Sequence, residues 1–221
     1  MKNNSNDGLT LYGYWRSSAS YRVRIALNLK SLTYTQVPVH LVKQGGEQHN
    51  PAFRAINPQG LVPVLQHDGH IITQSLAICE YLDEVFPQTS LLPQAPVMRA
   101  RIRSLALQIS CEIHPLNNLR VQHYLKEHSG GSIDTLTWMS HWMQEGFAAI
   151  ERQLGERELQ EADFFTHRPG LFECLLVPQV YNAERFDIDL SDFPQITRIV
   201  KRCRALPAFI AAAPENQADA Q

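Results

Sequence analysis

The chain has 221 residues, of which 44% are hydrophobic, and a formal net charge of -2 at pH 7. This length and apolar content suffice for one large or two small globular domains, and the near-neutral charge argues against a nucleic-acid partner. Because no apolar run approaches the ~18 residues that span a bilayer, and Met1–Gly8 lacks the apolar stretch of a signal peptide, we expect a cytoplasmic protein without a membrane partner.

The elements predicted for the first half, in chain order, are a strand over 9–15, a helix over 22–30, a strand over 34–39, a short helix from Pro51, strands over 61–66 and 71–73, and a helix over 74–82. The last two strands form a hairpin across Asp68-Gly69. This order mixes parallel and antiparallel pairing in one small sheet.

A proline-rich linker over 92–96 follows, and the rest of the chain reads as helix after helix. We place the domain boundary near Leu91, with an α/β domain over 1–90 and an all-α domain over 91–221. Residues 214–221 are predicted to be a frayed polar tail.

The cysteines and histidines show no metal-binding spacing. Cys79, Cys111, Cys174 and Cys203 form no Cys-x-x-Cys pair, which predicts neither a zinc site nor a disulfide framework. The nine histidines lack the His-Glu-x-x-His pattern. We therefore assign no metal.

Three small hydroxyl residues, Ser17, Ser18 and Ser20, stand where the first strand turns into the first helix. Backbone N–H groups, side-chain O–H donors and the helix dipole would converge there, which suits a thiolate or carboxylate. The alternative is an ordinary N-cap, with Ser18 or Ser20 closing its own helix.

Two further features suit an extended anionic ligand. Gln74-Ser75 opens a helix with polar side chains, although a plain helix cap would look the same. Pro63 at the start of an apolar strand indicates either an edge strand or a cis peptide bond. A cis bond would turn the backbone amide and carbonyl of Val62 outward.

Four strings spread along nearly the whole chain resemble the zeta class of cytosolic glutathione transferases, the maleylacetoacetate isomerases. They are Arg16-Ser17-Ser18-x-x-x-Arg22-Val23-Arg24-Ile25-Ala26-Leu27, Asn57-Pro58-x-x-x-Val62-Pro63, Gln74-Ser75-Leu76-Ala77-Ile78 and Leu176-Val177-Pro178-Gln179-Val180-Tyr181-Asn182-Ala183-Glu184-Arg185-Phe186. The resemblance implies a thioredoxin-like α/β domain followed by an all-α helical domain, and usually a homodimer.

The resemblance also implies that the first domain binds glutathione. Ser17, with Ser18 next to it, would donate its O–H to the glutathione sulfur and so favour the thiolate. Lowering the pKa of a thiol by one unit takes only ~1.4 kcal/mol. The Val62 backbone would pair with the cysteinyl part, and Gln74 and Ser75 would hold the γ-glutamyl carboxylate. Further contacts are expected from Ala19, Ser20, Tyr21, Arg22 and Pro63, and, at the glycyl end, from His40 and Gln48.

In the resembled family glutathione is a catalyst that adds to a cis double bond, permits rotation and is then eliminated. Such an enzyme must hold a maleyl dicarboxylate and stabilise an enolate, and arginine suits both tasks. Arg185 and Arg16 are the catalytic candidates beside Ser17 and Ser18. In the helical domain the resemblance places His114, Asn118, Leu119 and Arg120 at the site.

Alternative interpretations remain for these residues and for the function. Arg185 would otherwise form a salt bridge to Glu184 or Asp187, and His114 would otherwise be a capped or core histidine. The function could also be that of a maleylpyruvate isomerase, a general glutathione transferase, or a binding protein that kept the fold and lost the activity. A thiol-redox enzyme is excluded because the Ser17–Ser20 segment holds no cysteine.

The chain departs from the family pattern in two places. Ala19 stands where eukaryotic members usually carry cysteine, so any chemistry that uses that protein thiol is excluded. Gly170 replaces the usual hydroxyl N-cap of a core helix. Glycine at an N-cap lowers helix stability by only a few tenths of a kcal/mol relative to serine. The Glu173 side chain is expected to accept a hydrogen bond from the backbone N–H of the N-cap residue.

Overall fold

The computed structural model describes residues 8–155 and 164–221, which form two compact units. The first unit runs to Leu91 and also includes Ala205–Gln221, and the second is Leu92–Arg204. The sequence had placed everything after residue 90 in the helical domain. The last segment joins the first unit because the helix α9 (Pro207–Ala212) packs against α1 (Ser18–Leu29).

The first unit is built on a four-stranded mixed sheet in the order β2-β1-β3-β4. Its strands are β1 (Thr10–Gly13), β2 (Thr35–Pro38), β3 (Val64–His67) and β4 (His70–Thr73). β1 pairs with β2 in parallel, whereas β3 pairs antiparallel with both β1 and β4. The predicted hairpin is confirmed, with Asp68 at φ 48° and Gly69 at φ 80° in its turn.

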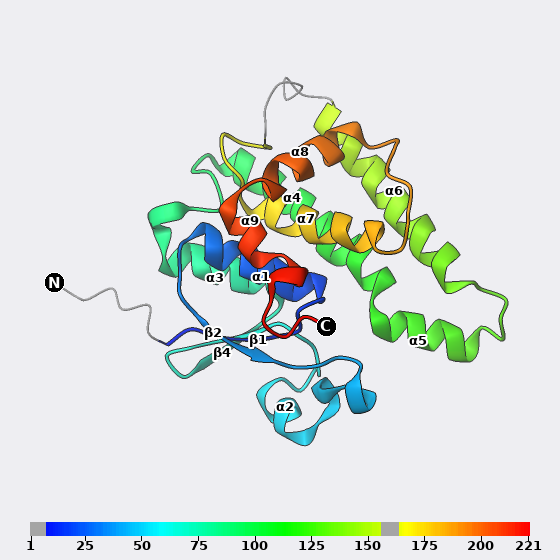
Figure 1. Cartoon of the computed structure of the whole chain (residues 1–221). Coiled ribbons are helices and arrows are strands. Elements are labelled where there is room, and N and C mark those ends of the chain that lie inside the picture. The colour runs from blue at the N-terminus through cyan, green and yellow to red at the C-terminus, as the bar shows by residue number, and fades with distance from the viewer. Residues whose placement is uncertain (1–7, 156–163) are drawn as a thin grey trace. The chain divides into compact units, whose positions relative to one another are not determined.

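Helices cover both faces of this sheet. Figure 1 shows α1 and α3 (Ser75–Val85) on one face and α2 (Pro51–Ile56) on the other. On the α2 face, Val39, Phe53 and Val64 form a buried cluster. Short 3-10 turns complete the unit at Lys43–Gly45, Glu47–His49, Pro87–Thr89 and Pro214–Asn216.

A buried ion pair fastens α1 to α3. Lys30 Nζ donates to Asp83 Oδ1 at 2.9 Å and to the carbonyls of Phe86 and Thr89 at 2.8 and 2.7 Å. Asp83 Oδ2 also accepts from the Ser90 hydroxyl at 3.0 Å. These hydrogen bonds offset the cost of burying the two side chains away from water.

The second unit is helical. Its elements are α4 (Pro96–Leu107), a π-helical turn Gln108–Ile113, a 3-10 turn His114–Asn117, α5 (Leu119–His128), α6 (Thr135–Gly155), α7 (Leu171–Glu184) and α8 (Pro194–Arg204). α7 is buried along nearly its whole length and packs against both α4 and α8. Within the described part of the chain, no helix is both long and apolar enough to cross a membrane.

Three local predictions need correction. The first helix begins at Ser18 rather than Arg22, so Ser18 and Ser20 lie in its first turn and Ser17 is its N-cap. The strand predicted over 61–66 begins only at Val64, after Pro63. Residues 214–221 are not frayed: Pro214 is buried, and Gln217 Nε2 donates to the carbonyls of Ala211 and Ala213 at 2.9 and 2.7 Å.

Glu173 closes the start of α7 in place of the missing hydroxyl cap. Its Oε2 accepts from the Gly170 amide and its Oε1 from the Phe165 amide, both at 2.8 Å, so the predicted reach-back is confirmed. The side chain is buried, and burial raises the pKa of this carboxyl against the opposite effect of these amides.

Replacing Glu173 should therefore destabilise the fold. In Glu173→Ala two buried backbone N–H groups lose their acceptor, and we expect the free energy of unfolding to fall by about 2–4 kcal/mol. Urea denaturation followed by circular dichroism measures this. Glu173→Gln keeps one acceptor oxygen and should lose less; an Ala variant as stable as the wild type would contradict the account.

Candidate active site

The strand registers bring the predicted glutathione-site segments of the first unit to one end of the sheet. Tyr12 of β1 pairs with Val64 at the start of β3, and Val64 pairs with Thr73 at the end of β4. The chain leaves β1 toward Ser17, enters β3 from Val62-Pro63, and leaves β4 toward Gln74. These segments therefore meet at that end although they are far apart in sequence.

Ser17 is the N-cap of α1, with extended backbone at φ -69° and ψ 120°. Its Oγ accepts from the Ser20 amide at 3.2 Å. The cap is thus Ser17 and not Ser18 or Ser20, as the alternative had it. An oxygen that accepts here keeps its own hydrogen, so Ser17 Oγ can still donate to an acceptor beyond the helix end.

The neighbours of Ser17 differ in their surroundings. Arg16 is half-buried, with its guanidinium 5.0 Å from the centroid of the Trp15 ring. Ser18 is 8% exposed and Ala19 is half-buried. Both stand in the first turn of α1, whose N–H groups have no carbonyl partner within the helix.

Ser20 and Tyr21 face the interior. Ser20 has no exposed surface, and its Oγ accepts from the Tyr14 amide at 3.3 Å. Tyr21 is 2% exposed. Both had been predicted to contact glutathione, but the structure uses the Ser20 hydroxyl to hold the backbone between β1 and α1.

The peptide bond between Val62 and Pro63 is cis, as one of the two sequence interpretations expected. Val62 is half-buried, and no described residue hydrogen-bonds its backbone N–H or C=O. Asn57 braces the preceding loop, because its side chain donates to the Leu61 carbonyl at 2.8 Å and accepts from the Gln59 amide at 3.1 Å. The motif that contains Asn57 does not by itself indicate this role.

The start of α3 is open to an outside acceptor. Gln74 stands at its N-cap with φ 70°, a left-handed conformation that is uncommon for residues other than glycine. Its side chain does not cap the helix but donates to Gln59 Oε1 at 2.9 Å. The helix dipole and the first-turn N–H groups therefore favour an anion at this position.

Ser75 is buried beside a buried guanidinium. Arg22, 2% exposed, donates from Nη1 to Ser75 Oγ at 3.1 Å. Because arginine can only donate, Ser75 must accept in this bond, which leaves its own hydrogen for another acceptor. Arg22 thus acts on this site through Ser75.

His40 and Gln48 lie after β2, the strand that runs parallel beside β1. His40 Nδ1 accepts from the amides of Val42 and Lys43 at 3.1 and 2.9 Å, so a neutral ring carries its proton on Nε2. Gln48 is buried; its Nε2 donates to the Leu41 carbonyl at 3.4 Å, and its Oε1 has no partner among the described residues.

The remaining candidates belong to the second unit. Asn118 caps α5, and its Oδ1 accepts from the Arg120 amide at 3.1 Å. His114 opens the 3-10 turn that precedes it. His114, Asn118 and Leu119 are half-buried, and Arg120 is exposed.

Arg185 stands at the C-cap of α7. It is exposed, with its guanidinium 4.5 Å from the centroid of the Phe186 ring. The carboxylate of Glu184, one of the salt-bridge partners considered for Arg185, binds Arg204 with both oxygens at 2.6 and 2.9 Å.

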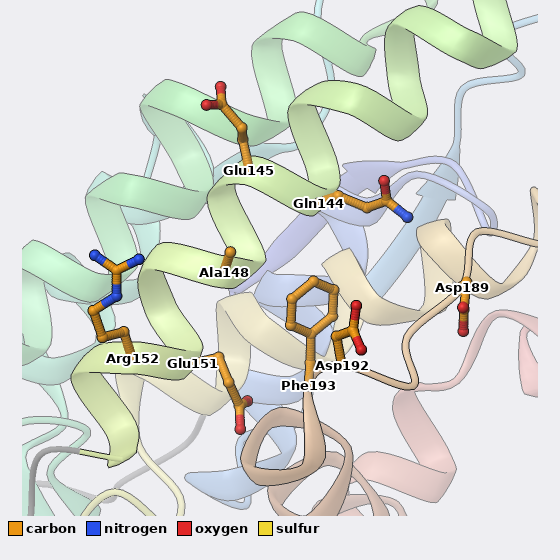
Figure 2. A pocket seen from close by; sticks show the side chains of 8 residues that line it. All are labelled: Gln144, Glu145, Ala148, Glu151, Arg152, Asp189, Asp192 and Phe193. Carbon is orange, nitrogen blue, oxygen red and sulfur yellow. The ribbon is translucent and has the colours of Figure 1, made fainter.

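A groove of about 540 Å³ lies elsewhere in the second unit, along α6 and the segment that leads into α8 (Figure 2). None of the predicted site residues lines it. Glu151 at this groove caps α8, because its carboxylate accepts from the amides of Gln195 and Ile196 at 2.7 and 2.9 Å. Among the described residues, no cluster of three or more His, Cys, Asp or Glu side chains could hold a metal ion.

Burial disfavours the thiolate form of two cysteines. Cys79 is fully buried on α3, and burial raises the pKa of its thiol to about 12. Burial likewise raises the pKa of the Cys203 thiol. Neither thiol is therefore suited to act as a nucleophilic thiolate.

Comparisons with known proteins agree with this geometry. Residues 11–90 match the model of the glutathione S-transferase N-terminal domain. The chain is 49% identical to a probable maleylacetoacetate isomerase of Vibrio cholerae, over 96% of this chain and 98% of the relative. It is 46% identical to the maleylacetoacetate isomerase of Pseudomonas aeruginosa, again over 96% of this chain and 98% of the relative.

Solved structures give the same result. The holo structure of a bacterial zeta-class maleylpyruvate isomerase is 41% identical, with a TM-score of 0.91, covering 96% of this chain and all of that one. A maleylacetoacetate isomerase from Anaeromyxobacter dehalogenans, solved with glutathione bound in its active site, is 40% identical with a TM-score of 0.86, covering 97% and 98%.

The first unit, with its mixed sheet, cis Pro63 and open helix starts, therefore has the glutathione transferase fold. More narrowly, the chain belongs to the zeta class of glutathione transferases, the maleylacetoacetate isomerase family.

Proposed function

We propose that this protein is a glutathione-dependent isomerase that converts maleylacetoacetate to its trans isomer, fumarylacetoacetate. The observation that carries the proposal is the N-cap geometry of Ser17, whose hydroxyl accepts from Ser20 and keeps a hydrogen to donate at the end of α1. A hydrogen-bond donor at a helix N-terminus stabilises a thiolate.

The residues of the first unit fit glutathione. Glutathione is a tripeptide with a carboxylate at each end and an extended backbone between them. Ser75 and the open start of α3 suit the γ-glutamyl carboxylate, and the unpartnered backbone of Val62 suits the middle. The buried Oε1 of Gln48, which has no partner in the described chain, suits a donor at the glycyl end, with His40 beside it.

Glutathione, when bound, supplies the thiolate that adds to and later leaves the double bond. Ser17 holds the proton of its hydroxyl toward the sulfur, and Ser18 and Ala19 present first-turn N–H groups beside it. Both effects favour the ionised sulfur. A shift of one pKa unit needs about 1.4 kcal/mol, which one charge-assisted hydrogen bond can provide.

Arginine side chains are proposed to hold the maleyl dicarboxylate. Arg185 binds one carboxylate through its planar fork, and Arg16, next to Ser17, binds the other carboxylate or the enolate oxygen. His114, Asn118, Leu119 and Arg120 are proposed to complete the substrate side of the site. The exposure of Arg185 supports this role, because a guanidinium in contact with solvent is accessible to a ligand.

Maleylpyruvate is the second candidate substrate, since both acids share the maleyl group. The similarity to a maleylpyruvate isomerase structure at a TM-score of 0.91 favours keeping it. We favour maleylacetoacetate, and with it a role in tyrosine and phenylalanine breakdown, because relatives with that name are 49% and 46% identical. A broader glutathione transferase activity is compatible with the same site.

We further propose a cytoplasmic homodimer. The cysteines of the described chain form no disulfide, which suits a reducing compartment; they are Cys79, Cys111, Cys174 and Cys203.

The isomerase proposal is tested with maleylacetone, followed by its ultraviolet absorbance with and without glutathione. We expect isomerisation that depends on glutathione. In Ser17→Ala, kcat should fall on the order of a hundredfold. In Arg185→Ala, the KM for maleylacetone should rise strongly. Arg185→Lys should recover only part of the loss, because lysine lacks the fork.

Two controls separate chemistry from folding. Ser17→Ala also removes an N-cap worth about 1 kcal/mol, whereas Ser17→Thr keeps the cap and a hydroxyl, so the unfolding of both is compared. A wild type that binds glutathione but isomerises nothing would reject the proposal in favour of a transferase or binding protein.

The dimer is tested by light scattering on the purified protein. The monomer mass is 25.1 kDa, and we expect twice that value. α4 exposes Val97 by 65% and Leu107 by 43%, which supports an interface on that helix. Val97→Glu should then shift the mass toward the monomer, while Ile71→Glu, at an exposed apolar residue of β4, serves as the matched control; a wild-type monomer would contradict the proposal.

A further inference from the structure

The backbone that carries Ser17 is held by side chains from several elements. Between β1 and α1, residues 14–17 form a turn that we call the catalytic turn. The Ser17 amide donates to the Tyr14 carbonyl at 3.0 Å. Arg24, fully buried, donates to the Tyr14 carbonyl at 3.4 Å and to the Trp15 carbonyl at 2.8 Å.

Another backbone donor of this turn finds its acceptor near the C-terminal end of the chain. The Trp15 amide donates to Asp219 Oδ2 at 3.2 Å, across 204 positions in sequence. The other carboxylate oxygen, Oδ1, accepts from Gln36 Nε2 on β2 at 3.1 Å. With both oxygens engaged, the carboxylate is fixed in orientation.

The segment that brings Asp219 to the turn is itself ordered. Asn216 Nδ2 donates to the Ile210 carbonyl at 2.7 Å, and Gln217 donates back to the end of α9. Arg24 Nε also donates to the Ala212 carbonyl at 2.9 Å, so one buried guanidinium holds both α9 and the catalytic turn. Figure 1 shows the C-terminal segment lying beside α1 and the sheet.

One peptide group connects Asp219 to Ser17. The Tyr14 carbonyl and the Trp15 amide belong to the same planar unit, so fixing one end fixes the other. Asp219 holds the amide end, and the carbonyl end receives the Ser17 amide. The carboxylate thereby orients the acceptor that sets the position of the Ser17 backbone.

We propose that Asp219 is a positioning residue for Ser17 and that residues 214–221 complete the catalytic turn. This inference rests on the proposed function, in which Ser17 stabilises the thiolate of glutathione. It gives the C-terminal segment a role in catalysis, although the active-site motifs described for the first unit all lie within the first ninety residues.

The test compares Asp219→Ala, Asp219→Asn and the control Glu215→Ala, an exposed acid on the same segment. Kinetics with maleylacetone and glutathione are measured against pH, and folding is followed by urea denaturation. We expect kcat to fall on the order of tenfold in Asp219→Ala, with the KM for maleylacetone unchanged, because a misplaced catalytic group costs rate. Glu215→Ala should match the wild type.

The direction of the pH shift distinguishes positioning from charge. Arg16, Arg24, His40 and Asp219 are ionisable groups in contact with the catalytic turn. Removing the Asp219 charge alone would lower the pKa of a nearby thiol and move the acid limb of the kcat profile to lower pH. Loss of positioning weakens the Ser17 bond to sulfur, raises that pKa and moves the limb to higher pH.

Asp219→Asn keeps an acceptor for Trp15 and removes only the charge, so its kcat should stay close to that of the wild type and its acid limb should not move to higher pH. An active wild type with an unshifted or downward-shifted limb in Asp219→Ala overturns this inference alone, whereas an inactive wild type overturns the proposed function with it. If Asp219→Ala fails to fold, Gln36→Ala replaces it as the test, because it removes one hydrogen bond that orients the Asp219 carboxylate. An acid limb moved to higher pH in Gln36→Ala supports the positioning role, and an unchanged pH profile rejects that role.

Discussion

The hydrogen bond from the Ser20 amide to Ser17 Oγ is the contact on which the account of this protein depends. It fixes the start of α1 and at the same time makes the Ser17 oxygen an acceptor, so that its hydrogen remains available to a ligand. From the sequence, a helix cap and a thiolate-stabilising group are alternative interpretations of the serines at this position. Here one geometry serves both purposes, and the activity is expected to follow from how firmly that geometry is held.

Buried cations in α1 and at its C-cap help to hold this geometry in place. Arg22, Arg24 and Lys30 are all buried, and each donates to a serine hydroxyl, backbone carbonyls or a carboxylate. A buried charge is tolerated only with such partners. As a result, the same helix, α1, holds both the catalytic turn, through Arg24, and the start of α3, through Arg22.

The sequence predicted the elements that follow local rules. Alternating apolar residues gave the strands, Asp68-Gly69 gave the hairpin turn, Pro63 gave the cis peptide as one of two options, and Glu173 gave the reach-back cap. Glutathione as the cofactor followed from the family resemblance that these motifs carry, and the comparisons confirm it.

What the sequence missed depends on contacts between distant residues. The tail was predicted to fray because residues 214–221 are polar and short, yet Asp219 bonds to Trp15, 204 positions away. Ser20 looked like a ligand-binding hydroxyl because it lies near Ser17, but burial commits it to the Tyr14 amide. The local sequence around Asp219 or Ser20 does not reveal its hydrogen-bond partner. Only the folded structure shows which serine hydroxyl faces outward.

The most direct test of the central claim is a titration of the glutathione thiol on the enzyme, followed by thiolate absorbance in the ultraviolet, for the wild type and Ser17→Ala. The account predicts a bound thiol pKa at least about one unit below the free value of ~8.5, rising back toward it in the variant. A bound thiol that titrates like the free one, or a lowered pKa unchanged by Ser17→Ala, would contradict it.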